Sequence, residues 1–292
     1  MDAGGATKNA TIEGNAMMNN HNDQRIADDA SLAPFIDAHI HLDTYTEEQQ
    51  HALLTSLSPS IAAVIAVSMH QQSSQYNLKL AQKYPSLIHP AFGFHPEQPL
   101  PLEEEILQLF SFMEEHLKQM VAVGEVGLPY YSRLEAQEAG LSFNHAAYVT
   151  LLERFISFAS IHKKPIILHA VYEDADIACN LLEQYNVTRA HFHWFKGSAN
   201  TVERMIHNGY YISFTPDIVY EPEIQELARL YPKDQVMAET DGPWPFEGPF
   251  SGQMTHPEMV STVIEKWSQL QGLPVSKARK LMYDNTRRFY KL

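Results

Sequence analysis

The chain has 292 residues, of which 45% are hydrophobic, enough to bury one large core. Its 35 acidic and 21 basic residues give a formal net charge of −14 at pH 7, so the composition offers no basic surface for a long nucleic-acid interface. With 1 cysteine it forms no intramolecular disulfide, and no apolar stretch approaches the roughly 20 residues of a membrane helix. We therefore expect a cytoplasmic protein with no membrane segment and no obligate protein partner.

The first part of the chain, residues 1–33, is polar and poor in aromatic residues. It lacks both the apolar centre of a secretion signal and the basic bias of a transit peptide. We predict a disordered leader over 1–33 and a single domain over 34–292.

Short apolar runs rich in β-branched residues alternate with longer amphipathic stretches from about residue 34 onward. This alternation is typical of βα units around a parallel sheet. The predicted strands are 35–39, 62–68, 88–94, 120–124, 165–169, 189–193, 210–214 and 235–239. Helical patterns include 103–118, 144–162, 174–185, 201–208, 221–231 and 257–270. Eight strands favour an α/β fold of the (β/α)8 TIM-barrel type, regular or distorted, although a doubly wound open sheet has the same alternation.

Side chains that can bind metal stand at the ends of six of these strands. In parallel barrels the catalytic groups come from the carboxyl ends of the strands, because the loops there are free of the packing that constrains the other end. We therefore expect these side chains to converge on one cavity. They are His39, His41, His95, Glu125, His169, His193 and Asp241.

Four of these histidines are candidate metal ligands. His39 and His41 are two positions apart on a strand, so both rings project from the same face and can reach one ion. His169 and His193 each close an apolar strand, and neutral imidazoles suit Zn, Mn, Fe or Co better than Ca. His191 also lies two positions before His193, but His193 stands at the very end of the strand and is the preferred ligand.

The two carboxylates of the set have different predicted roles. Glu125 lies between glycines after an apolar run, where burying a carboxylate is costly unless it meets a cation. Its two oxygens could bridge two metals, although pairing with an arginine is the alternative. Asp241 could bind metal and accept a proton from the attacking water, or form an Asx-turn or a helix cap.

Other residues are candidates for the substrate pocket. His95 precedes Pro96 at a strand end, and we expect it to touch substrate, with a structural hydrogen bond as the alternative. Trp244, Phe246 and Phe250 could wall the pocket or pack as a proline-rich loop.

These residues carry a resemblance to a known family. From about residue 35 to 290 the chain resembles the TatD family of metal-dependent hydrolases, within the wider amidohydrolase-like barrels. The motifs are 37–41 (DAHIH), 93–96 (GFHP), 124–128 (GEVGL), 168–169 (LH), 193–197 (HWFKG), 239–241 (ETD) and 285–289 (NTRRF).

The resemblance implies a site for two divalent metal ions, Zn, Mn or Mg. One would be held by His39, His41 and Asp241 and the other by His169 and His193, with Glu125 bridging them. His95 would lie beside a substrate phosphate. The family is associated with metal-dependent nucleases, including deoxyribonucleases, and some members deacylate aminoacyl-tRNA.

The chain departs from the family pattern at three positions. Pro129 replaces the usual Asp, Val171 replaces a common Arg, and Lys196 stands where a small residue is usual, which makes it a candidate substrate contact. Losing the Arg leaves a phosphate with one fewer bidentate partner. Every predicted ligand position keeps the family residue, so the departures bear on the substrate and not on the metal chemistry.

The predicted function is metal-dependent hydrolysis of a phosphodiester in a nucleic acid or nucleotide. Water activated by the metals would attack, and Asp241 would accept its proton. One alternative keeps the metals and hydrolyses an amide, ester or lactone, including aminoacyl-tRNA. Another is a non-catalytic barrel with a structural metal site.

Overall fold

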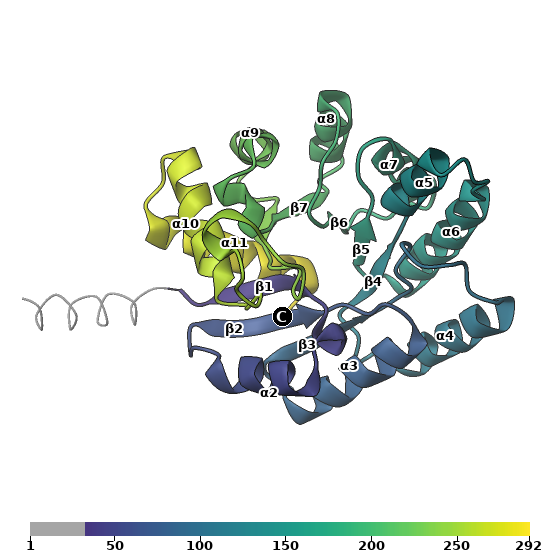
Figure 1. Ribbon diagram of the computed structural model, residues 1–292, viewed down its shortest axis with the longest axis horizontal. Coiled ribbons are helices and arrows are strands. Elements are labelled where there is room, and N and C mark those ends of the chain that lie inside the picture. Colours follow the sequence, from purple (N-terminus) through teal and green to yellow (C-terminus); the bar gives the residue numbers. More distant parts are fainter. Residues whose placement is uncertain (1–32) are drawn as a thin grey trace, which may run out of the picture. The chain divides into compact units, whose positions relative to one another are not determined.

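A computed structural model describes residues 33–292 of the chain, so the predicted leader lies outside the described residues apart from Ala33. Eight parallel strands form one sheet whose order follows the chain, and helices surround it (Figure 1). The predicted (β/α)8 barrel is therefore confirmed. The strands are β1 (Phe35–Ile40), β2 (Ile61–Ala66), β3 (Ile88–Phe92), β4 (Ala122–Gly127), β5 (Ile166–His169), β6 (Ala190–Phe192), β7 (Tyr211–Phe214) and β8 (Val236–Ala238).

The helices follow the strands in the order expected of βα units. The α-helices are α2 (Glu47–Ser56), α3 (Gln71–Lys83), α4 (Glu103–Glu115), α5 (Tyr130–Glu138), α6 (His145–His162), α7 (Glu173–Gln184), α8 (Ala199–His207), α9 (Pro222–Leu230), α10 (Met259–Gln271) and α11 (Val275–Tyr290). Short 3-10 turns are η1 (Leu42–Thr44), η2 (Pro216–Val219) and η3 (Gly248–Phe250). No helix within the described residues has the length and apolar character needed to cross a membrane.

The barrel closes between its last and first strands through bonds near their carboxyl ends. The backbone N–H of Asp241 donates to the carbonyl of His39 at 2.9 Å, and that of His41 donates to the carbonyl of Gly242 at 2.8 Å. Beside them, the carboxylate of Asp37 accepts a hydrogen bond from the backbone N–H of Thr240 at 3.0 Å. This seam brings residues about 200 positions apart into contact, and three of the candidate ligands, His39, His41 and Asp241, lie on it.

A small apolar cluster lies within the barrel and supports the candidate site. Its strand residues include Ile167 on β5 and Met237 on β8, both fully buried. Because side chains alternate along a strand, His169 and Glu239 share the faces of these two residues. Phe289 and Tyr290, at the end of α11, complete the cluster. Beneath the site the barrel interior therefore holds a packed apolar cluster, with the buried His191 bonded to Tyr290 beside it.

Candidate metal centre

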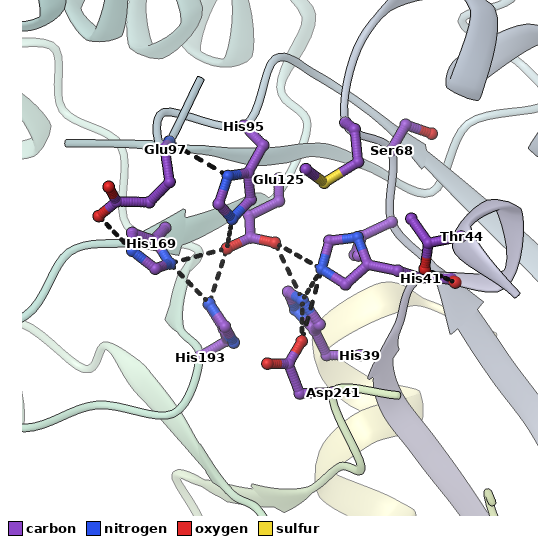
Figure 2. A network of polar contacts seen from close by, with 12 residues as sticks. His39, His41, Thr44, Ser68, His95, Glu97, Glu125, His169, His193 and Asp241 are labelled. Atoms are coloured by element: carbon purple, nitrogen blue, oxygen red, sulfur yellow. Dashed lines mark hydrogen bonds and ion pairs between the residues drawn. The ribbon is translucent and has the colours of Figure 1, made fainter. Parts of the chain in front are cut away.

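The six predicted ligands lie together at the carboxyl ends of the strands, around the carboxylate of Glu125 (Figure 2). Oε2 of Glu125 is 3.1 Å from Nε2 of both His39 and His41. Oε1 is 2.7 Å from Nε2 of His193 and 3.2 Å from Nδ1 of His169. The two oxygens thus face two different pairs of histidines.

Asp241 completes the group on the side of β1. Its Oδ1 is 3.3 Å from Nε2 of His39 and 3.4 Å from Nε2 of His41. The backbone of Asp241 has a positive φ of 51°, as do Tyr172 at 51° and Trp194 at 39°, and these three residues follow β8, β5 and β6. Left-handed conformations of non-glycine residues are unfavourable and concentrate at functional sites.

The arrangement of nitrogen atoms fits bound cations. Nε2 of His39 lies 3.3 Å from Nε2 of His41, and Nδ1 of His169 lies 3.3 Å from Nε2 of His193. Paired nitrogens that also face carboxylate oxygens are arranged as ligands of a common ion. Donor atoms lie within 4.8 Å of one another in the group His39, His41 and Asp241, and again in the group Glu125, His169 and His193. The residues present therefore fit bound divalent cations.

Opposite charges face one another across the centre and shift its pKa values. Burial lowers the pKa of His41, but hydrogen bonds from its ring to Asp241 and Glu125 outweigh burial and raise that pKa to about 10. Burial raises the pKa of Glu125, yet the charges of the surrounding histidines hold it well below its usual range. Metal ions bind neutral imidazole, so a bound cation would displace the proton that this raised pKa favours on His41.

Two carboxylates beside the centre were not assigned a role from the sequence. Oε1 of Glu97 is 3.3 Å from Nε2 of His169. Oε1 of Glu239 is 3.5 Å from Nδ1 of His193, an electrostatic contact without the alignment of a hydrogen bond. Their spacing in the sequence could have indicated them. Glu97 follows His95 by two positions, and Glu239 precedes Asp241 by two, the spacing at which side chains of an extended strand share a face.

The remaining candidates lie at different distances from the centre. Nε2 of His95 is 3.4 Å from Oε1 of Glu125, so this ring borders the ligand group. Lys196 lies instead over Trp194, with Nζ 5.7 Å from the ring centre. His191 is fully buried in the barrel, where its ring bonds to the hydroxyl of Tyr290 at 2.8 Å.

The aromatic residues after Asp241 divide between packing and exposure. Phe246 and Phe250 are buried, as expected of a packed loop. The Trp244 side chain is 56% exposed, and its ring centre lies 5.7 Å from that of Trp194. Only Trp244 of these three is therefore available to line a pocket.

Known proteins resemble this chain in sequence and in fold. A metal-dependent hydrolase of Haemophilus influenzae, described as uncharacterized, is 38% identical over 257 residues, which cover 88% of this chain and 99% of the relative. Human deoxyribonuclease TATDN3 is 24% identical over 87% of this chain and 94% of its own length. The crystal structure of the TatD homologue YjjV from Escherichia coli has the same fold, with a TM-score of 0.75 and 23% identity over 88% of this chain and 98% of that one.

A family model described as TatD related DNase matches residues 36–291, nearly all of the described chain. The match spans β1 through α11 and so includes every strand that contributes to the centre. The chain belongs to the TatD family of metal-dependent hydrolases.

Proposed function

We propose that this protein hydrolyses phosphodiester bonds of a nucleic acid or nucleotide, using two divalent cations, Zn, Mn or Mg. The proposal depends on one observation: the two oxygens of Glu125 face two separate histidine pairs. Two cations that share a carboxylate form the clamp used in many phosphodiester hydrolyses.

In this proposal the cluster divides into two ligand groups. His39, His41 and Asp241 would hold one cation, His169 and His193 would hold the other, and Glu125 would contribute an oxygen to each group. When bound, the cations polarise the phosphoryl oxygen and lower the pKa of water.

The exposure of the two carboxylates supports different tasks for them. The Glu125 side chain has no exposure, so we assign it to holding the two ligand groups at a fixed separation. The Asp241 side chain keeps 11% of its surface exposed and can meet water. Burial raises the pKa of Asp241, but hydrogen bonds from His39 and His41 outweigh it and hold that pKa below its usual range. Asp241 is therefore ionised at neutral pH, as an acceptor of the water's proton must be, although the lowered pKa makes its carboxylate a weaker base.

Contacts at the rim and the names of relatives support a phosphodiester as the substrate. His95 borders the ligand group, where its ring could bind a phosphoryl oxygen. Val171 is buried and contributes no charge, and Lys196, whose Nζ lies over the ring of Trp194, is the candidate cationic contact for a substrate phosphate. The human relative is named a deoxyribonuclease, and the matching family is described as TatD related DNase.

A substrate panel tests the proposal. Protein stripped with chelator and reloaded with Zn, Mn or Mg is assayed on a chromogenic phosphodiester, a DNA oligonucleotide, a carboxyl ester, a lactone and an aminoacyl-tRNA. We expect turnover of the two phosphodiesters, and a loss of at least roughly a hundredfold in Asp241→Asn, because general-base catalysis contributes about that much.

The panel also separates the alternatives. Turnover of only the ester, the lactone or the aminoacyl-tRNA would replace the phosphodiester proposal with the alternative hydrolase. Metal binding without any hydrolysis would favour a structural metal site. Circular dichroism of Asp241→Asn must match the wild type for its loss of activity to count.

A further inference from the structure

His169 stands out among the four histidines of the proposed ligand set because it faces the centre with a different atom. His39, His41 and His193 face Glu125 with Nε2, whereas His169 faces it with Nδ1. The Nε2 of His169 points to Glu97 on the other side of the ring (Figure 2). Both ring nitrogens of His169 are thus engaged, on opposite sides.

The contact with Glu97 favours a proton on Nε2 of His169. A carboxylate only accepts hydrogen bonds, and a neutral imidazole has one N–H and one lone pair. The 3.3 Å contact between Oε1 of Glu97 and Nε2 of His169 is therefore a hydrogen bond when Nε2 carries the proton. In that tautomer the lone pair is on Nδ1, which faces the centre.

The carboxylate of Glu97 is itself held by the first turn of α5. Its Oε1 accepts from the backbone N–H of Tyr131 at 2.9 Å, and its Oε2 accepts from the backbone N–H of Ser132 at 2.8 Å and from its hydroxyl at 2.5 Å. The free N–H groups at a helix start are natural partners for a carboxylate. Glu97 is thereby held in place before any ion binds.

We propose that Glu97 is a positioning residue, which links the start of α5 to His169 and presents Nδ1 of that ring to the cation. A half turn of the ring about Cβ–Cγ would place a carbon where Nδ1 stands, and the bond to Glu97 opposes that turn. Carboxylates that orient a ligating histidine from behind contribute substantially to metal affinity. The inference rests on the proposed ligand set and not on which bond is hydrolysed.

Glu97→Gln is the variant that tests this role. An amide has one accepting end and one donating end. In either orientation its NH2 group faces a backbone N–H of α5, and two donors cannot form a hydrogen bond. We expect the variant to bind one zinc ion as the wild type does, and the second roughly 10–100-fold more weakly. The measurement is zinc titration of chelator-stripped protein against a chromophoric competitor, which needs no substrate.

Two further variants separate positioning from general damage. Ser132→Ala removes one hydrogen bond to Glu97 and leaves every charge in place. We therefore expect the affinity for the same ion to fall by less than in Glu97→Gln. In the double variant with Glu97→Gln, the affinity for this ion should be no lower than in Glu97→Gln alone, because both substitutions break the same chain of hydrogen bonds from α5 to His169. Glu103→Gln is the matched control: it removes a carboxylate paired with Arg154 on the surface and should leave both affinities unchanged.

Two results would overturn the proposal. One is wild-type affinity for both zinc ions in Glu97→Gln. The other is a crystal structure of the zinc-loaded wild type in which His169 either binds no ion or coordinates it through Nε2. If no phosphodiester is cleaved but Glu97→Gln weakens one zinc ion, the proposed function fails while this inference stands.

Discussion

The two histidine pairs of the centre are held in place by different means. In the β1 pair, His39 and His41, the main chain is fixed by the backbone bonds of the barrel seam and by the Asp37 carboxylate, which accepts from the N–H of His39 at 3.2 Å. Within residues 33–292, the Nδ1 atoms of these two rings have no hydrogen-bond partner.

In the β5–β6 pair, His169 and His193, each ring is backed by a carboxylate. Glu97 faces His169 and Glu239 faces His193. The β1 pair therefore depends on the strand and its closure, whereas the β5–β6 pair depends on side chains from elsewhere in the fold. Mutations of these supports should act on one proposed ion and spare the other.

The largest effect on metal content and activity is expected from a change to Glu125, which contacts both pairs. Glu125→Gln removes the charge that both pairs share, so we expect both ions to be lost. Losing about 4 kcal/mol of transition-state stabilisation lowers hydrolysis roughly a thousandfold. Elemental analysis of protein purified without chelator, together with the phosphodiester assay, measures both. Retention of one full equivalent of metal would show that Glu125 serves only one pair.

A smaller effect is expected from damage to a single pair. His41→Ala should reduce the metal content from two equivalents to one, because the ligands of the β5–β6 pair are untouched. His207→Ala, on the exposed end of α8, is the control and should keep both. Loss of both ions in His41→Ala would mean that the pairs do not bind independently.

The smallest effect is expected behind the β5–β6 pair. Glu239→Gln should weaken the ion of that pair about tenfold. Glu239 is also buried and accepts from the backbone N–H of Trp194 at 2.9 Å and from the hydroxyl of Ser213 at 2.5 Å. Disturbing these bonds should lower the free energy of unfolding by about 1–3 kcal/mol. Urea denaturation in the presence of chelator measures the loss of stability without any contribution from bound metal. An equal loss of affinity for both ions would contradict the distinction between the two pairs.

The sequence predicted the features that follow from strand periodicity. Each of the eight strands lies where an apolar run was found, because burial on both faces leaves a continuous hydrophobic signature. The six candidate ligands were found by their position at strand ends, and they do lie together. Their role as ligands stays a prediction.

Features that depend on loop geometry were not predictable in the same way. Helix α5 has no buried residue, so it lacks the apolar stripe by which helices such as α4 and α6 were predicted. The contact between Glu97 and His169 joins a loop to the last residue of β5, 72 positions away, and leaves no periodic signal. Lys196 was singled out by its departure from a family pattern, which says nothing about where its flexible side chain rests.

If His39 and Asp241 bind an ion as proposed, the seam between β8 and β1 would couple occupancy of the centre to the integrity of the barrel. His39 and Asp241 are both candidate ligands and partners in a backbone bond that holds the first and last strands together. An ion bound by both residues would stabilise the closed barrel by mass action, and separation of β1 from β8 would release the ion. Release of the ion would then require the local opening of the seam. The rate of hydrogen exchange at the backbone N–H of Asp241 and the rate of ion release would report the same opening.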